Sequence, residues 1–223
     1  MKKGQVSFFI IIGIIMVIVI VLLMFLSKEL EFDNVQPEEV EPFITSCLEQ
    51  SAESAIKYLS LRGGILDAQE SIIVNGREIT VLRNGDDIYV PDDDILKSQL
   101  EMLTENYLKE CVDIGRFHGD ITLGSPKVIA EANPNSIIFN LEYPVSVTLG
   151  EEVYKKDKFL ANIDTRFFYV FSEIRKSVNM IDNGMYNMTH LANLDIDTKA
   201  IDTPDAVIFD FKEDDMHAVY AVR

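Results

Sequence analysis

The most constraining feature of the sequence is an apolar run near its start, residues 8–26, which reads FFIIIGIIMVIVIVLLMFL. The run contains no charged or hydrogen-bonding side chain. As a helix it would be roughly 29 Å long, which matches the roughly 30 Å hydrocarbon core of a bilayer. A soluble helix keeps a polar face, and this run has none. The sequence therefore predicts a helix that spans the lipid bilayer.

The charges around this run predict how it lies in the membrane. Lys2 and Lys3 precede it, whereas Lys28 alone follows before a stretch of acidic residues. Lys and Arg favour the cytoplasmic side, so we expect a cytoplasmic N-terminus and an extracytoplasmic main domain at the plasma membrane. The run is longer than the core of a signal peptide and no A-x-A site follows it, so we expect a retained single-pass anchor.

The composition limits the partners of the main domain. The whole chain has a net charge of −17, and residues 29–223 carry 17 basic against 37 acidic residues. Such a surface repels nucleic acid, and it favours solubility, cations and basic partners. We expect no nucleic-acid partner. Apolar residues recur in regular patterns along this part, which is typical of a folded domain.

The chain divides into three predicted parts. Residues 1–27 form the anchor with its short basic N-terminus, and residues 28–41 form an acidic stalk. Residues 42–223 form the ectodomain, either as one unit or as two sub-domains covering 42–115 and 116–223.

Apolar residues at spacings of three and four predict three amphipathic helices in the ectodomain. The first begins at Pro42 and ends before Gly63. The second covers about residues 96–111 and the third about residues 167–181. We expect either Asp164 or Thr165 to cap the third helix.

Three adjacent aspartates, Asp92, Asp93 and Asp94, precede the second helix. They could cap the helix N-terminus or contribute to a calcium site, and capping is the preferred interpretation because no calcium-ligand spacing follows them.

Short β-prone runs at 71–74, 79–82 and 88–90 predict an antiparallel meander. Asn75-Gly76 and Asn84-Gly85 separate them, and Asn-Gly tolerates the positive φ angles of tight turns.

The clearest strand is predicted at 138–149, where apolar and polar residues alternate. Pro144 cannot donate a backbone hydrogen bond, so this strand lies at a sheet edge or is bulged there. Its expected neighbours, 127–132 and 159–163, complete a second meander.

A polar loop is predicted at 182–204, followed by a hairpin of 207–211 and 218–222 that turns at 213–215. The predicted fold class is α+β: a single N-terminal transmembrane helix, then an extracytoplasmic domain of about three amphipathic helices and antiparallel β meanders.

The chain has two cysteines, Cys47 and Cys111, each on the apolar face of a predicted helix. If these helices pack antiparallel, the start of one lies beside the end of the other and the two sulfur atoms meet. A disulfide is permitted outside the cytoplasm, and we prefer it to the alternative of two separate buried thiols.

No spacing of catalytic residues stands out. His118, His190 and His217 are isolated, and no H-E-x-x-H, G-x-S-x-G, P-loop or G-x-G-x-x-G occurs. We therefore expect no enzymatic activity, no cofactor and no metal site.

Two weaker motifs lie near residue 190. Asn193, Asp195 and Asp197 have the 1, 3, 5 spacing of a calcium loop but lack its glycine and its terminal glutamate. Asn187 begins an N-x-T glycosylation sequon in a predicted loop on the predicted outer side.

The opening Met-Lys-Lys-Gly-Gln-Val-Ser and its Ile-rich continuation resemble the leader of archaeal type IV pilin-like proteins. The resemblance implies cleavage by a prepilin peptidase between Gly4 and Gln5, with the apolar helix left attached.

Four short segments resemble a family of membrane-anchored proteins from small-genome archaea. The resemblance implies the same architecture and paired cysteines, and it implies no activity. The segments are Lys2-Lys3-Gly4-Gln5, Ser46-Cys47-Leu48-Glu49, Leu61-Arg62-Gly63-Gly64 and Ala218-Val219-Tyr220-Ala221-Val222.

Three functions follow as hypotheses. The first is a membrane-anchored cell-surface structural or interaction protein without catalytic activity, with a protein partner in the envelope or with self-assembly. The second is a pilin-like filament subunit. The third is an extracytoplasmic enzyme or solute-binding domain, because pockets made of scattered residues leave no motif.

Overall fold

The computed structural model describes residue 16 and residues 37–113, 120–149, 151–181 and 188–223. Within these ranges no helix combines the length and the apolar character that crossing a membrane requires. The predicted span at 8–26 lies outside the described residues except for Met16, so the anchor stays a prediction. The described part of the chain is α+β, as predicted.

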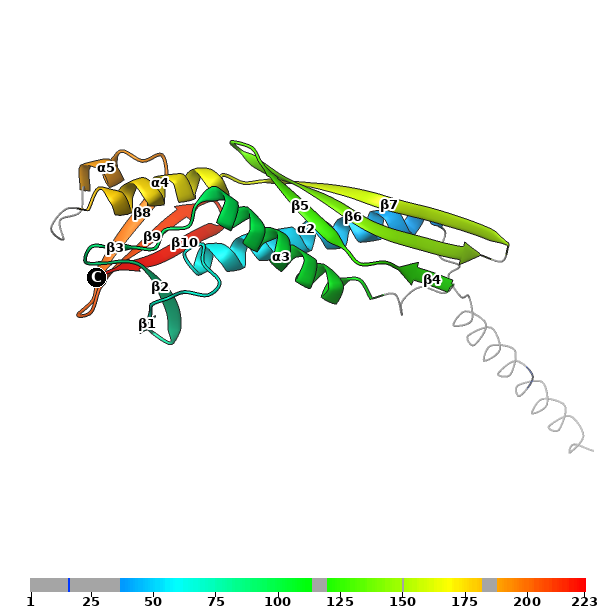
Figure 1. The fold of residues 1–223 in the computed structure, drawn as a ribbon, viewed down its shortest axis with the longest axis horizontal. Coiled ribbons are helices and arrows are strands. Elements are labelled where there is room, and N and C mark those ends of the chain that lie inside the picture. Colours follow the sequence, from blue (N-terminus) through cyan, green and yellow to red (C-terminus); the bar gives the residue numbers. More distant parts are fainter. Residues whose placement is uncertain (1–15, 17–36, 114–119, 150, 182–187) are drawn as a thin grey trace, which may run out of the picture.

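The described residues form four helices and two sheets (Figure 1). The helices are α2 (Pro37–Leu61), α3 (Asp93–Cys111), α4 (Phe167–Asn179) and α5 (Met188–Ala192). The first sheet contains β1 (Ser71–Val74), β2 (Arg77–Asn84), β3 (Asp87–Ile88), β8 (Asp197–Asp202), β9 (Val207–Glu213) and β10 (Met216–Val222). The second contains β4 (Asp120–Leu123), β5 (Lys127–Ala132), β6 (Ser136–Leu149) and β7 (Glu152–Asp164).

Helix α2 connects the two sheets. It begins beside the four-stranded sheet and runs to the six-stranded one, where it packs on β10 (Figure 1). The prediction that this helix begins at Pro42 was wrong, because it begins at Pro37. A proline in the first turn costs no internal hydrogen bond, and Pro42 removes only one. Burial of Val40 and Ile44 on one helix face outweighs that loss.

The end of α2 agrees with its prediction. Gly63 and Gly64 come two and three residues after Leu61, the last helical residue, and have φ angles of 63° and 81°. The Gly64 N–H donates to the Leu59 carbonyl at 2.9 Å, which satisfies one of the carbonyls that a helix C-terminus leaves open. Only glycine adopts these angles without strain, so the two residues turn the chain sharply out of the helix.

Of the two predicted helix N-caps, that of α3 is confirmed and that of α4 was wrong. The Asp92 carboxylate accepts a hydrogen bond from the Ile95 N–H at 2.8 Å, which confirms the predicted cap of α3. The predicted cap of α4 was wrong, since Arg166 occupies the N-cap position and makes no side-chain cap bond. Asp164 instead ends β7, and the Thr165 N–H donates to the Asn135 carbonyl.

The six-stranded sheet has the order β1-β2-β10-β9-β8, with β3 beside β2. The predicted meander at 71–90 and the hairpin of β9 and β10 are both present. The parallel pairing of β2 with β10 was not predicted. Strand β8 and helix α5 also lie within the predicted loop at 182–204. Strand β8 has no buried residue, so its sequence carries no alternating apolar pattern.

The four-stranded sheet is built on β6. This strand pairs with β7 along its length on one side and with β5 on the other, as predicted for its neighbours. It also pairs with β4, a strand that was not predicted. The predicted bulge is at Pro144, where Tyr143 and Pro144 lie opposite the single residue Asp157. The Gly124 N–H, between β4 and β5, donates to the Pro144 carbonyl at 2.7 Å.

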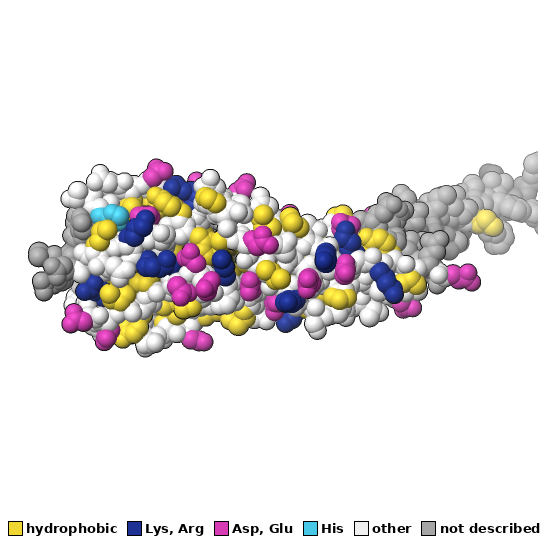
Figure 2. All heavy atoms as spheres, turned by 45° about the horizontal axis from the view of Figure 1, so that its top comes forward, with side chains coloured by type: hydrophobic (Ala, Val, Ile, Leu, Met, Phe, Trp, Pro, Cys, Tyr) yellow, Lys and Arg dark blue, Asp and Glu magenta, His cyan; other side chains and the backbone are white. Residues whose placement is uncertain are grey.

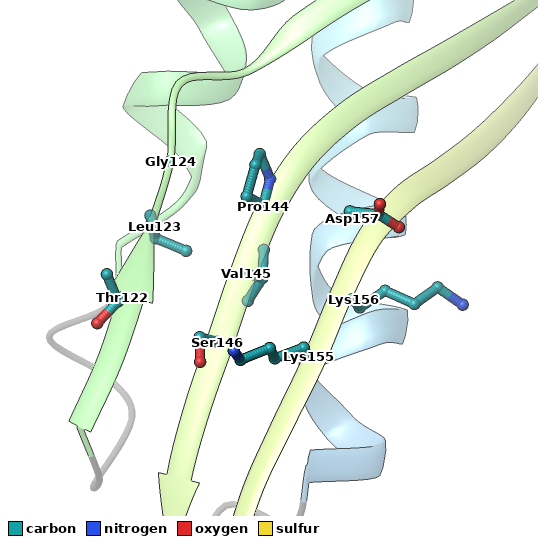
Figure 3. A pocket seen from close by; sticks show the side chains of 9 residues that line it. All are labelled: Thr122, Leu123, Gly124, Pro144, Val145, Ser146, Lys155, Lys156 and Asp157. Carbon is teal, nitrogen blue, oxygen red and sulfur yellow. The ribbon is translucent and has the colours of Figure 1, made fainter.

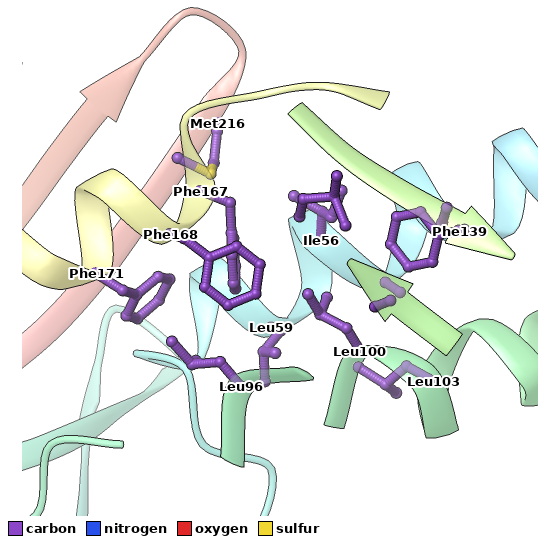
Figure 4. Packing of buried hydrophobic residues seen from close by; sticks show 14 of the residues in the cluster. Ile56, Leu59, Leu96, Leu100, Leu103, Phe139, Phe167, Phe168, Phe171 and Met216 are labelled. Carbon is purple, nitrogen blue, oxygen red and sulfur yellow. The ribbon is translucent and has the colours of Figure 1, made fainter. Parts of the chain in front are cut away.

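One hydrophobic cluster runs through both parts of the fold. Figure 4 shows Phe139 of the four-stranded sheet and Met216 of the six-stranded sheet in one cluster with side chains from α2, α3 and α4. The rings of Phe167 and Phe171 lie 4.7 Å apart within this cluster. Because the packing is continuous, the helices hold the two sheets in a defined arrangement.

Candidate interaction surface

The four-stranded sheet is covered on one face only. Its inward side chains, among them Phe139 and Leu141, are buried against α2 and α3. The outer face carries residues that are exposed or half-buried, and no described helix packs on it. Figure 3 looks onto this outer face, with α2 visible behind the sheet. A sheet with one solvent-exposed face is common, but the exposed face of this sheet carries apolar side chains among the polar ones.

The strand register arranges the outer face in rows across β5, β6 and β7. The central row includes Ile129 and Leu160, whose exposed fractions of 39% and 56% are high for such side chains. The rows on either side are charged or mixed. In order along β6, the three rows are Glu131–Ile138–Asn162, Ile129–Asn140–Leu160 and Lys127–Glu142–Lys158. We call these nine residues the outer patch.

A hollow of about 630 Å³ lies beyond the outer patch on the same sheet. It forms where β4 and β5 are separated and β6 is bulged, and Pro144, Ser146 and Lys155 line it (Figure 3). A Cβ atom on Gly124 would lie 3.0 Å from the Pro144 ring, so only glycine fits against this bulge without displacement. Gly124 and Pro144 thus form a closely packed part of the wall of the hollow.

Neighbouring lysines on β7 have different surroundings. Lys155 and Lys156 both border the hollow, and the Lys156 ammonium also donates to the Glu41 carboxylate of α2 at 2.7 Å. This hydrogen bond raises the pKa of Lys156 above its ordinary value. Lys156 thus fastens β7 to the first turns of α2 and is not part of the outer face.

The β5 edge of the sheet is closed by α3. The Glu101 and Glu105 carboxylates accept hydrogen bonds from the backbone N–H groups of Ala130 and Val128, both at 2.9 Å. These two glutamates are four residues apart on one face of α3, and the two N–H groups are two residues apart on one edge of β5. The carboxylates thus occupy donors that another strand would otherwise use.

The opposite edge, β7, contains Lys155, Lys156, Asp157 and Lys158 in succession. Charged residues on an edge strand discourage the addition of another strand. Figure 2 shows charged side chains of both signs along the visible face of the molecule, with small hydrophobic areas between them. The outer patch is therefore better suited to face-to-face contact than either edge is to strand pairing.

A second hollow, of about 390 Å³, lies where α2, the start of α4 and the β9–β10 turn meet. Arg166 donates to the carboxylates of Glu213 at 2.7 Å and Asp195 at 3.4 Å, and its guanidinium lies 4.2 Å from the centre of the Tyr169 ring. These contacts fix Arg166 as a link between α4 and the six-stranded sheet.

The predicted disulfide is confirmed: Cys47 of α2 is bonded to Cys111 of α3, and their Cα atoms are 5.7 Å apart. The helices pack antiparallel, as the prediction required. The predicted cleavage site at Gly4 and Gln5 and the sequon at Asn187 lie outside the described residues.

The two described histidines, His190 and His217, have separate carboxylate partners. His190 of α5 lies 3.7 Å from the buried carboxylate of Glu173, and His217 lies 3.0 Å from Asp210. His118 lies outside the described ranges. Across those ranges no group of three or more His, Cys, Asp or Glu side chains could hold a metal ion.

The calcium-like spacing at 193–197 has a different role. Asp195 pairs with Arg166, and Asp197 begins the edge strand β8.

Sequence reasoning did not find the outer patch. Alternation of apolar and polar residues predicted that β6 has two faces. The available sequence signal for an apolar surface was the presence of Ile129 and Leu160 in the neighbouring strands. Whether a face is covered depends on where α2 and α3 pack. Comparison with known proteins adds no site residue, because no protein-family model, curated protein or solved structure matches the chain.

Proposed function

We propose that the protein is a membrane-anchored cell-surface interaction protein without catalytic activity, and that the outer patch is its binding surface. The observation that carries the proposal is the uncovered face of the four-stranded sheet, with Ile129, Ile138 and Leu160 between charged residues. Protein–protein contacts commonly combine apolar side chains with polar and charged ones, as the outer patch does around Asn140. The partner is a protein of the envelope, which the apolar and charged side chains of the outer patch bind.

Two further observations support an extracytoplasmic location. Disulfides persist in oxidising compartments, and Cys47 and Cys111 are bonded. The anchor at 8–26 places the domain on the outer side by the distribution of lysines around it. Helix α2 begins at Pro37, so ten residues separate the anchor from the folded domain and reach at most about 35 Å. The domain thus stays close to the membrane surface.

Site-specific photo-crosslinking in the native membrane tests the binding surface. A photoreactive residue at Leu160 should give a protein adduct, because this side chain lies in the central row of the outer patch. The matched control is Ile73 on β1, which is 79% exposed and therefore at least as accessible. Equal adduct yields from the two positions, or none from Leu160, would count against the outer patch.

The second test asks whether a substitution in the outer patch removes the adduct formed from Leu160. Asn162→Asp adds a charge at an exposed position of the outer patch with almost no change in side-chain size. The variant should keep its thermal stability and lose most of the Leu160 adduct.

A filament subunit is the second candidate, because Lys2-Lys3-Gly4-Gln5 precedes the apolar run as a cleavable leader would. The intact mass of the protein from its native membrane decides it: loss of four residues favours a filament subunit, and a full-length N-terminus excludes one.

A further inference from the structure

We propose that the partner of the outer patch is a second copy of the same chain, related by a two-fold axis that runs along the row Ile129–Asn140–Leu160. The inference rests on the proposed function in two respects: the outer patch is a contact surface, and the chain is anchored in a membrane. It goes further by naming the occupant and the orientation in which it binds.

The charge pattern selects this axis. Rotation about the central row places the row that contains Lys127 over the row that contains Glu131 in the second copy. Each copy then contributes one Lys127 ammonium and one Glu131 carboxylate, so two opposite-charge contacts form across the axis. Neither side chain makes an ion pair within the described chain; Glu131 accepts one hydrogen bond, from the Asn140 amide at 2.9 Å. That bond engages one carboxylate oxygen and leaves the other open.

The alternative axis is unfavourable. A two-fold axis parallel to the strands would exchange β5 with β7 and place Lys127 over Lys158 of the second copy, which are like charges. Edge-to-edge association is also disfavoured, because Glu101 and Glu105 close the β5 edge and charged residues line the β7 edge. Face-to-face packing of two sheets with antiparallel strands is the remaining arrangement.

The central row becomes the centre of this contact. Ile129, Asn140 and Leu160 each face their own counterpart, so the two exposed apolar side chains are covered at once. The contact is small, since only nine side chains of each copy take part, and it is weak for two molecules in dilute solution. Anchoring both copies in one membrane raises their effective concentration, which compensates for a small interface.

Cysteine crosslinking of the full-length protein in its membrane tests the arrangement. Asn140→Cys places a thiol beside its counterpart on the axis, so a short bismaleimide should link two copies. Thr148→Cys is the matched control, on the same face of the same strand but eight residues away, about 27 Å along β6. A dimer band from Asn140→Cys and none from Thr148→Cys is expected. Equal bands, or no band from Asn140→Cys, overturn the proposal.

Charge reversal tests the orientation in the Asn140→Cys background. Lys127→Glu and Glu131→Lys alone each create like-charge contacts twice across the axis, and each should slow crosslinking by about tenfold. The combined Lys127→Glu/Glu131→Lys variant restores both opposite-charge contacts and should recover most of the rate. Single variants that fold and crosslink as fast as the parent, or a double variant slower than either single, would overturn the axis.

The two proposals fail in distinguishable ways. A Leu160 photo-adduct with a different protein and no self-adduct overturns the second copy as occupant and leaves the proposed function standing. No adduct of any kind removes both.

Discussion

Cys47 of α2 is covalently bonded to Cys111, the last residue of α3, so the third turn of one helix is fixed to the end of the other. Both helices line the inner face of the four-stranded sheet, and α2 also reaches the six-stranded one. The bond thus fastens together the two helices that line the four-stranded sheet, one of which also packs on the six-stranded sheet.

Removal of this disulfide should destabilise the domain strongly. The cysteines are 64 residues apart, and closing such a loop contributes about 4 kcal/mol in the chain-entropy model. The Cys47→Ala/Cys111→Ala variant should lose most of this free energy of unfolding in urea titrations. Reductant should lower the stability of the parent and leave the double variant unchanged. An effect of reductant on the double variant would contradict the assignment.

Gly64 should not tolerate alanine. A Cβ atom there would lie 2.6 Å from a Phe171 ring carbon and 2.8 Å from a Leu96 methyl, at a φ of 81°. Gly64→Ala should therefore cost about 2 to 4 kcal/mol, from overpacking together with backbone strain. Gly76 is the matched control, because its φ is 78° and a Cβ would meet nothing within 4 Å. Gly76→Ala should cost only about 1 kcal/mol by thermal denaturation.

Replacing two buried threonines by valine should have opposite effects on stability. The Thr104 hydroxyl is fully buried and has no hydrogen-bond partner among the described atoms, whereas the Thr80 hydroxyl donates to the Arg62 carbonyl at 2.7 Å. Thr104→Val removes an unsatisfied group with little change of shape, so it should be neutral or raise stability by about 1 kcal/mol. Thr80→Val should lower stability by about 1 kcal/mol. The same sign for both variants would contradict this account.

The bonds from α3 to the β5 edge should contribute to stability. Glu101→Ala would leave the Ala130 N–H without its carboxylate partner and should cost about 1 to 2 kcal/mol in urea titrations. Glu101→Gln keeps an acceptor oxygen and should cost less. Glu110 on the same helix is exposed and makes no described hydrogen bond, so Glu110→Ala should change stability by less than about 0.5 kcal/mol.

Stability should fall at high pH through Tyr143. Burial raises the pKa of this phenol above its usual value of about 10, and the side chain is only 4% exposed. Above about pH 10 the unfolded chain loses the Tyr143 proton while the folded chain retains it, so the free energy of unfolding decreases as pH rises. Tyr143→Phe should match the parent at pH 7 and decline less steeply above pH 10. Parallel curves would contradict the assignment.

Local signals in the sequence were sufficient for much of the fold. Alternation in β6, the Asp92 cap and the Asn75-Gly76 turn each involve residues within a few positions of one another, and all three are confirmed. The pairing of Cys47 with Cys111 needed one further step, the antiparallel packing of two helices with clear apolar faces.

The failures have physical causes of two kinds. Pro42 is a helix breaker by its own chemistry, but burial of Val40 and Ile44 on either side of it favours a helix that begins at Pro37. Strand β8 is held by backbone bonds to β9 and by little side-chain burial, so its sequence resembles a polar loop. In both cases tertiary contacts outweigh the local preference.

The sequence by itself determined the three long helices except for the start of α2, most of the strands and the disulfide. Periodicity, turn chemistry and two cysteines act locally or on neighbouring elements. Only the tertiary structure decided that β2 pairs in parallel with β10, that Glu101 and Glu105 close the β5 edge, and that the face bearing Ile129 and Leu160 stays uncovered. These features join residues far apart in the chain. Their contact free energy depends on how whole helices and sheets pack, and no local pattern records that packing.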